Sequence, residues 1–119
     1  MKVMVIDDDN LVLETVGDYL RDAGHEAVLL HSAGEALRTM SESRVDAVVT
    51  DVLMPDMDGI EFIRRLRRDW PKLWVVAMSG GGQHLSAAFN LQFSQAFGAN
   101  RLLAKPLLPD DLLAALPDA

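Results

Sequence analysis

Short apolar segments alternate five times with segments of helical periodicity along this chain. The segments that predict strands are Lys2–Ile6, Ala27–Leu30, Val45–Thr50, Leu73–Met78 and Arg101–Ala104. Such alternation is typical of a parallel sheet that is covered by helices on both faces. We therefore predict a doubly wound α/β fold. Periodicity alone leaves the order of its strands open.

The helical segments between these strands have recognisable start and stop signals. The first predicted helix, Leu11–Ala23, should turn one face inward, formed by Val12, Val16, Tyr19, Leu20 and Ala23. The other helices are predicted after the capping pair Ser32 and Glu35, from Asp58 to the stop at Trp70-Pro71, along the stripe Leu85, Phe89, Phe93 and Phe97, and between Pro109 and Pro117.

The bulk properties of the chain narrow the class of protein. Its 119 residues are enough for one domain with its own core, and we treat 1–119 as a single domain. A net charge of −7 leaves no excess of basic side chains for phosphates, which argues against a nucleic-acid partner. There is no cysteine, no signal-peptide pattern and no apolar run near the roughly 20 residues of a membrane span. We therefore expect a cytoplasmic domain without a membrane partner.

Aspartates follow two of the predicted strands. Asp7 and Asp8 come directly after the first strand, and Asp51 follows the third. In a parallel sheet these positions meet at the carboxyl edge, where open α/β sheets place their sites. Two carboxylates about 4 Å apart repel by roughly 4 kcal/mol at an effective dielectric constant near 20. A cation must therefore neutralise the cluster, and an all-oxygen ligand set favours Mg²⁺.

Each of these residues also has a simpler explanation. An aspartate after a strand often caps the next helix, but one residue of Asp7-Asp8-Asp9 is enough for that task. Asp51 has no capping role, because the next predicted helix begins seven residues later. A buried carboxylate of this kind requires a compensating charge nearby.

Two further strands end in polar residues. Ser79 follows the fourth strand and Lys105 follows the fifth. Alone, Ser79 could bond to its own backbone and Lys105 could be a solvated strand end. A carboxylate nucleophile, a metal ion, a hydroxyl and an ammonium together form a site for a phosphoryl group.

Two other patterns carry less weight. The glycines Gly80–Gly82 lack the Lys-Ser/Thr ending of a phosphate-binding P-loop. The basic run formed by Arg64, Arg65, Arg67 and Arg68 is interpreted as the solvated face of a helix.

The strand-end residues, in this order and spacing, resemble the receiver domain of two-component response regulators along essentially the whole chain. The matching motifs are Asp7-Asp8, the segment from Asp51 to Gly59, the hydroxyl of Ser79 and the pair Lys105-Pro106. The resemblance implies a flavodoxin-like, five-stranded parallel sheet of order 2-1-3-4-5 with helices on both faces.

The resemblance also implies a chemistry for the site. Asp51 would accept a phosphoryl group from a phosphohistidine on a sensor histidine kinase or a histidine phosphotransfer protein. Asp8 and Asp51 would bind Mg²⁺ directly together with the backbone carbonyl of Leu53, and Asp7 would act through water. Lys105 would pair with Asp51 and then with the phosphoryl group.

A conformational switch and a partner surface are implied as well. Ser79 would move to donate a hydrogen bond to the phosphoryl group, and the Lys105–Pro106 peptide bond would be cis. Leu11 lies on the polar side of the first helix, beside Thr15. By the resemblance, Leu11 and Thr15 lie near Pro106 and Leu107. This is the place where receivers dock the helices of their kinases.

The chain departs from the family pattern in two respects. Leu102 stands where receivers usually carry the aromatic residue that turns inward when the hydroxyl moves. We therefore do not expect the usual aromatic readout, although an aliphatic side chain could still change its packing. The last helix is short, and no output domain follows it in this sequence, which indicates a stand-alone receiver or a piece of a longer protein. The output partner stays open.

Two alternative functions compete with the signalling switch. A Mg²⁺-dependent phosphohydrolase would need a second acid two residues after the nucleophile, but position 53 is Leu, so we expect no enzyme beyond hydrolysis of its own aspartyl phosphate. A pseudo-receiver would bind a partner without phosphorylation. Such proteins usually lack an acid or the lysine, whereas all are present here, so this alternative ranks second.

Overall fold

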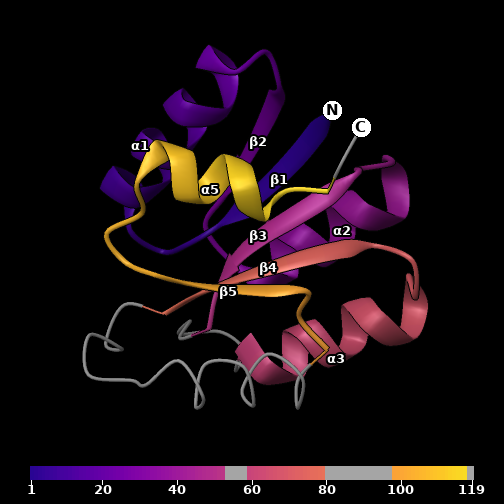
Figure 1. Ribbon diagram of the computed structural model, residues 1–119. Coiled ribbons are helices and arrows are strands. Elements are labelled where there is room, and N and C mark those ends of the chain that lie inside the picture. The colour runs from indigo at the N-terminus through magenta and orange to yellow at the C-terminus, as the bar shows by residue number, and fades with distance from the viewer. Residues whose placement is uncertain (53–58, 80–97, 118–119) are drawn as a thin grey trace.

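The computed structural model describes residues 1–52, 59–79 and 98–117 as an α/β sandwich (Figure 1). Its strands are β1 (Lys2–Ile6), β2 (Glu26–Leu30), β3 (Ala47–Asp51), β4 (Trp74–Ser79) and β5 (Arg101–Ala104). Its helices are α1 (Asn10–Asp22), α2 (Ala33–Glu42), α3 (Gly59–Asp69) and α5 (Pro109–Ala115). The predicted helix along Leu85, Phe89, Phe93 and Phe97 and the helix start at Asp58 lie outside the described residues.

All five strands are parallel and lie in the order β2-β1-β3-β4-β5. The predicted doubly wound fold and strand order are thereby confirmed. β3 is central and pairs with β1 on one side and with β4 on the other. This pairing brings the ends of β1 and β3 together, because Ile6 lies opposite Thr50. The residues that follow these two positions are Asp7 and Asp51.

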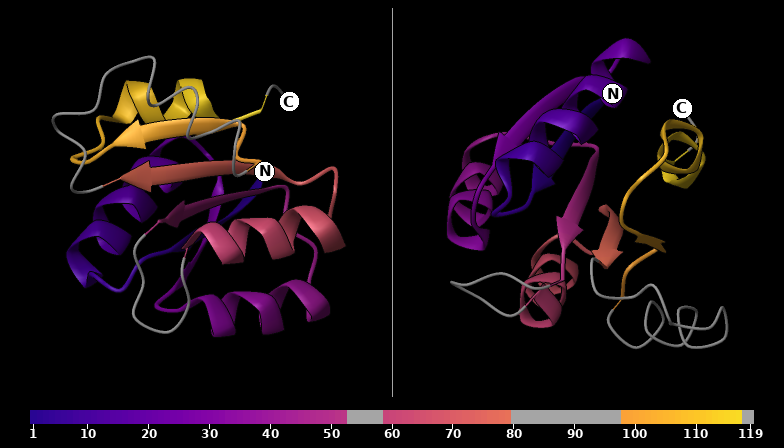
Figure 2. Two further views of the ribbon diagram at one scale, coloured as in Figure 1. Left: turned by 90° about the horizontal axis from the view of Figure 1, so that it is seen from below. Right: turned by 90° about the vertical axis from the view of Figure 1, so that its left-hand side faces the viewer.

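Helices cover both faces of the sheet (Figure 2). Val3 and Val5 of β1 face α1 and α5, whereas Met4 and Ile6 face α2 and α3. All four side chains are buried, which explains why the strand is apolar without interruption. No helix within the three described ranges is both long and apolar enough to cross a membrane.

The buried face of α1 differs from the predicted one. Leu13 is buried, whereas the expected Ala23 is exposed. Ala23 lies beyond the last turn as the C-terminal cap, and its N–H bonds back to carbonyl oxygens of that turn. Val16 and Leu20 point inward as predicted, and Leu11 points to solvent with 70% of its surface exposed.

Arg67 on α3 is a structural residue, and the interpretation of its basic run as a solvated face is wrong at this position. Its guanidinium donates to the carbonyl oxygens of Gly98 (2.7 Å), Pro71 (3.0 Å) and Leu73 (2.6 Å) and to Oδ1 of Asn100 (2.9 Å). Burial lowers the pKa of Arg67 from its ordinary value. The side chain therefore ties the end of α3 to the segment that leads into β5.

Replacing Arg67 by Lys should destabilise the domain by about 2 kcal/mol, because one ammonium cannot reach four oxygen atoms from a single position. Urea unfolding followed by far-UV circular dichroism measures this difference. The matched control is Arg64→Lys on the exposed side of the same helix, expected within about 0.5 kcal/mol of the wild type. Equal midpoints for the two variants would show that the contacts of Arg67 add nothing to stability.

Candidate functional site

Three carboxylates meet at the carboxyl edge of the sheet. One carboxylate oxygen from each of Asp7, Asp8 and Asp51 lies within 4.8 Å of the others. Asp7 and Asp51 are buried and Asp8 is exposed, so the cluster opens to solvent on one side. The predicted meeting of these three side chains is confirmed, and their oxygens fit the hard ligand set of a single divalent cation such as Mg²⁺.

The three consecutive aspartates after β1 have different structural roles. Asp9 is the N-cap of α1, and its Oδ1 accepts a hydrogen bond from the backbone N–H of Leu11 at 2.9 Å. Oδ1 of Asp7 accepts from the backbone N–H of Asp9, also at 2.9 Å, which fixes the orientation of that carboxylate. Capping therefore occupies Asp9 and leaves Asp8 and the second oxygen of Asp7 facing the cluster.

Lys105 supplies the positive charge that the buried carboxylates require. Its Nζ lies 2.6 Å from Oδ2 of Asp7 and 3.4 Å from Oδ2 of Asp51. The expected ion pair with Asp51 is present, and the shorter contact, with Asp7, was not predicted. The two residues of that shorter contact are 98 positions apart in the chain, and no sequence pattern links them.

The electrostatics of the site favour a further cation. Burial alone would lower the pKa of Lys105, but its hydrogen bond to Asp7 and the charges of Asp51 and Asp7 raise that pKa above its ordinary value. Lys105 is therefore a fixed positive charge at neutral pH. Three carboxylates against one ammonium leave two negative charges, which one Mg²⁺ ion would neutralise.

Ser79 lies beside Lys105 at the ends of neighbouring strands. β4 ends at Ser79, which pairs with Ala104 of β5, and the backbone N–H of Lys105 donates to the carbonyl oxygen of Ser79 at 3.0 Å. The serine is half-buried. Asp51 ends β3 opposite Met78 of β4, so the strand ends that carry Asp51, Ser79 and Lys105 adjoin one another.

Val52, which directly follows Asp51, is held against the start of α3. The N–H of Gly59 donates to the carbonyl oxygen of Val52 at 3.1 Å, and Val52 in turn donates to the carbonyl oxygen of Met78. A Cβ atom at position 59 would lie 2.4 Å from the backbone of Val52, so only glycine allows this approach. Leu53, expected to offer its carbonyl oxygen to a metal, lies outside the described residues.

A small groove adjoins the site on the α1 side. We call it the α1 groove; its volume is about 180 Å³, and its lining consists of Leu11, Val12, Thr15, Val16, Tyr19, Lys105, Pro106 and Leu107. The Lys105–Pro106 peptide bond is cis, as expected. The predicted partner residues Leu11, Thr15, Pro106 and Leu107 therefore line one continuous surface next to the carboxylates. Leu102, which replaces the usual aromatic residue, is half-buried and packs against the core on the α2 and α3 side.

Fold and site together define a flavodoxin-like domain with a carboxylate–lysine centre at the carboxyl edge of its sheet. The family model "Response regulator receiver domain" matches residues 3–117, and the chain belongs to this family of two-component signalling proteins.

Relatives and solved structures agree with this assignment. The response regulator MprA of Mycobacterium avium (strain 104) is 33% identical over 116 residues, which cover 98% of this chain and 49% of that protein. The chemotaxis response regulator CheY4 of Vibrio cholerae superimposes with a TM-score of 0.82 at 30% identity, covering 95% of this chain and 92% of that one. The receiver domain of the Francisella response regulator 1452 gives a TM-score of 0.83 at 26% identity, covering 95% and 90%.

The chain spans about half the length of the curated relatives that it matches. The family therefore establishes what this domain is: a signalling module of a two-component system and not an enzyme that turns over external substrates. The single-domain organisation, the cytoplasmic location and the absence of a nucleic-acid partner stay predictions.

Proposed function

We propose that Asp51 is the phosphoacceptor of this receiver and takes its phosphoryl group from a phosphohistidine of a sensor histidine kinase or a histidine phosphotransfer protein. A carboxylate oxygen of Asp51 attacks phosphorus as the P–N bond breaks. The electron pair of that bond leaves with the imidazole, which takes up a proton. The product is an acyl phosphate on Asp51 and a neutral histidine on the partner.

The position of Lys105 supports this role most directly. Its ammonium lies 3.4 Å from Oδ2 of Asp51 and remains within the site through its 2.6 Å contact with Asp7. In phosphoryl transfer the protein acts mainly by positioning the reacting groups and by stabilising charge. The transition state spreads negative charge over the phosphoryl oxygens. A fixed ammonium beside the acceptor oxygen stabilises that charge.

Asp8 and Asp51 would hold Mg²⁺ directly together with the backbone carbonyl of Leu53, and Asp7 would contribute through water. The ion supplies charge neutralisation for the acceptor carboxylate and for the phosphoryl oxygens. The exposure of Asp8 leaves the cluster accessible to an incoming ion. Asp7 is buried, and its carboxylate is held in place by the hydrogen bond that it accepts from the N–H of Asp9.

Ser79 and Lys105 form the proposed switch. After transfer, the hydroxyl of Ser79 donates to a phosphoryl oxygen and the ammonium of Lys105 exchanges its contact with Asp51 for one with the phosphoryl group. Both residues are joined through the bond from the N–H of Lys105 to the carbonyl oxygen of Ser79. Movement at either one therefore pulls on the ends of β4 and β5. Leu102 on β5 would respond by repacking, since it has no aromatic ring to turn inward.

The α1 groove is the proposed docking surface for the phosphate donor. Leu11 is a large apolar side chain with 70% exposure, and Thr15, Pro106 and Leu107 continue the surface toward the carboxylates. A donor helix whose apolar residues pack here would bring its phosphohistidine to the acceptor.

The experiment that tests this function is phosphorylation with acetyl phosphate and Mg²⁺, read by intact mass. One added phosphoryl group per chain is expected. Removal of the metal with EDTA before the donor is added should reduce the adduct to background, because the carboxylate cluster would then repel the incoming phosphoryl oxygens. Adding Mg²⁺ in excess over EDTA should restore the phosphoryl adduct.

A pseudo-receiver that acts without phosphorylation predicts a different result. It would give no adduct with acetyl phosphate, or with a phosphorylated kinase domain, at any concentration of Mg²⁺. The presence of all three carboxylates and of Lys105 in contact favours the phosphorylated switch.

A further inference from the structure

Three polar side chains are buried within the described part of the chain. They are Asp7, Thr50 and Asp51, and the two aspartates belong to the carboxylate cluster. Thr50 directly precedes the proposed acceptor and is fully enclosed. A buried hydroxyl is unfavourable unless it is hydrogen-bonded. Its partner therefore indicates what a polar residue does at this position.

Thr50 lies on the opposite face of the sheet from the side chain of Asp51. It pairs with Ile6 of β1 and with Ala77 of β4, and both of these side chains belong to the core under α2 and α3. Paired residues of a parallel sheet share a face, and successive residues of a strand alternate between the faces. Thr50 is thus a polar residue in an apolar row, and it can act on the carboxylates only through the backbone.

The hydroxyl of Thr50 holds the peptide group that follows the acceptor. It donates to the carbonyl oxygen of Asp51 at 3.0 Å. The N–H of the same peptide group belongs to Val52 and donates to the carbonyl oxygen of Met78 at 3.1 Å. The carbonyl oxygen of Val52 in turn accepts from the N–H of Gly59 at 3.1 Å. Three bonds in succession therefore fix the backbone from the acceptor to the start of α3.

This peptide group matters because it adjoins the acceptor. A rotation of its plane has to be absorbed by the backbone on either side, which displaces the Cα atom of Asp51 and its carboxylate relative to Lys105. It also redirects the chain toward Leu53, the proposed carbonyl ligand. Because a misplacement of about 1 Å can cost roughly 100-fold in rate, a smaller displacement should still cost several-fold.

We propose that Thr50 is a positioning residue for phosphoryl transfer: its hydroxyl fixes the peptide group between Asp51 and Val52 and thereby holds the acceptor carboxylate in place beside Lys105. This inference rests on the proposed role of Asp51 as the acceptor. Threonine meets both demands of the position, because its methyl group fills the apolar row and its hydroxyl bonds to the backbone. Valine would meet only the first demand and serine only the second.

The variants Thr50→Val and Thr50→Ser test the two parts of the side chain separately. Thr50→Val keeps the shape but removes the donor to Asp51, and should slow phosphorylation by acetyl phosphate at saturating Mg²⁺ about fivefold. Thr50→Ser keeps the donor and should react at nearly the wild-type rate, although loss of the buried methyl group lowers its midpoint in urea. Thr39→Val is the matched control, because it removes a similar hydroxyl bond, to the carbonyl oxygen of Glu35 on α2, and should leave the rate unchanged.

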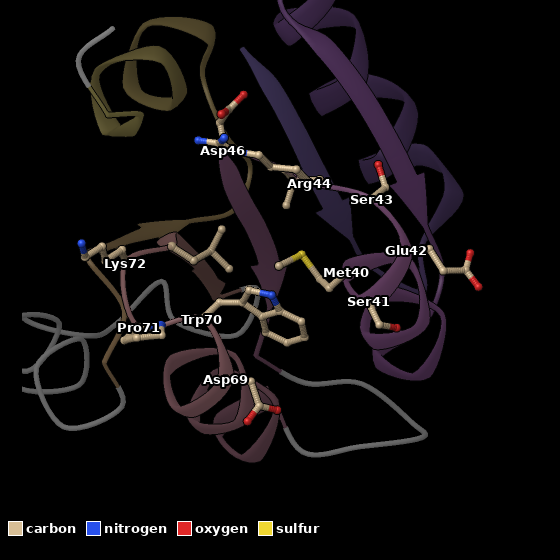
Figure 3. A pocket seen from close by; sticks show the side chains of 12 residues that line it. Met40, Ser41, Glu42, Ser43, Arg44, Asp46, Asp69, Trp70, Pro71 and Lys72 are labelled. Atoms are coloured by element: carbon tan, nitrogen blue, oxygen red, sulfur yellow. The ribbon is translucent and has the colours of Figure 1, made fainter.

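A second measurement, by NMR, is independent of phosphorylation. The carbonyl ¹³C shift of Asp51 and the amide ¹⁵N shift of Val52 report hydrogen bonding at their shared peptide group, and should change in Thr50→Val but not in Thr50→Ser. The Mg²⁺ affinity, from titration of the Asp8 amide, should fall about threefold in Thr50→Val alone. The internal control is the indole N–H of Trp70, which lies in a hollow between the ends of α2 and α3 at the amino edge of the sheet (Figure 3). An unchanged indole shift shows that this core is intact.

The outcomes distinguish the role of Thr50 from the proposed function. If the wild type forms the adduct and Thr50→Val reacts equally fast, Thr50 is not a positioning residue and Asp51 remains the acceptor. Equal slowing by Thr50→Val and Thr50→Ser would also overturn the proposal, since packing and not the hydroxyl would then be the cause. If the wild type forms no adduct, the proposed function fails, and equal Mg²⁺ affinities of wild type and Thr50→Val would overturn the positioning role as well.

Discussion

Asp51→Asn is expected to abolish the phosphoryl adduct that acetyl phosphate and Mg²⁺ produce on the wild-type chain. The amide has no anionic oxygen to attack phosphorus, and no other carboxylate of the cluster has the same relation to Lys105 and the end of β3. Intact mass spectrometry after a fixed reaction time measures the difference. Asp111→Asn, an exposed aspartate on α5, is the matched control and should be phosphorylated like the wild type. An adduct on Asp51→Asn would place the acceptor elsewhere.

The same substitution should raise stability when Mg²⁺ is absent. Asp51 is buried beside Asp7 and Asp8, and replacing one of three like charges removes repulsion of about 1–2 kcal/mol, since Lys105 still balances Asp7. Mg²⁺ should narrow the difference in stability between Asp51→Asn and the wild type, because only the intact cluster gains the full binding energy of the ion. Urea unfolding with Mg²⁺ and with EDTA measures both effects. A variant less stable than the wild type in EDTA would contradict the repulsion.

Lys105→Met should have the second large effect, on stability and on switching. Removing the ammonium leaves Asp7 and Asp51 buried without their cation and should destabilise the metal-free domain by roughly 2–3 kcal/mol. This is below the roughly 3–5 kcal/mol typical of a fully buried pair that loses one partner, because Lys105 keeps some contact with solvent. Mg²⁺ should recover part of the loss.

The switching effect of Lys105→Met is read separately. The adduct should still form, since Asp51 and the metal ligands remain, but amide shifts around Ser79 on phosphorylation should be smaller than in the wild type. Lys105→Arg keeps a positive charge at this position and is therefore the control for the loss of charge in Lys105→Met. Identical shifts around Ser79 in wild type and Lys105→Met would remove Lys105 from the proposed switch.

Much of the fold follows from local sequence signals. β1 and β5 begin and end at the predicted residues. β1 is an uninterrupted apolar run, and β5 is a short strand whose end is marked by Lys105-Pro106. The capping of α2 by Ser32 is also confirmed, with the N–H of Glu35 donating to its Oγ at 3.2 Å. β3 and β4 begin later than expected, since the hydrophobic residues Val45 and Leu73 belong to the connections and still pack on the core.

The parts that could not be predicted depend on contacts between distant segments. Arg67 looks like its neighbours in a basic run, and only the position of Gly98 and Asn100 beside α3 distinguishes it. The same holds for Lys105, whose preference for Asp7 over Asp51 is set by the geometry of the folded sheet. The aspartates were predictable as a group because strand ends in a parallel sheet must meet. Which one caps α1 was not, since all three are chemically alike.

The sheet order has a consequence for where this molecule resists deformation. β3, which carries Asp51, has a hydrogen-bonded strand on each side, whereas β5 in the described sheet has only β4. Amide hydrogen exchange should therefore be slowest along β3 and faster along β5, where opening one ladder frees the strand. The proposed acceptor Asp51 therefore ends a strand that is anchored on both sides, whereas Lys105 follows a strand at the margin of the described sheet, where a shift of position is opposed by fewer hydrogen bonds.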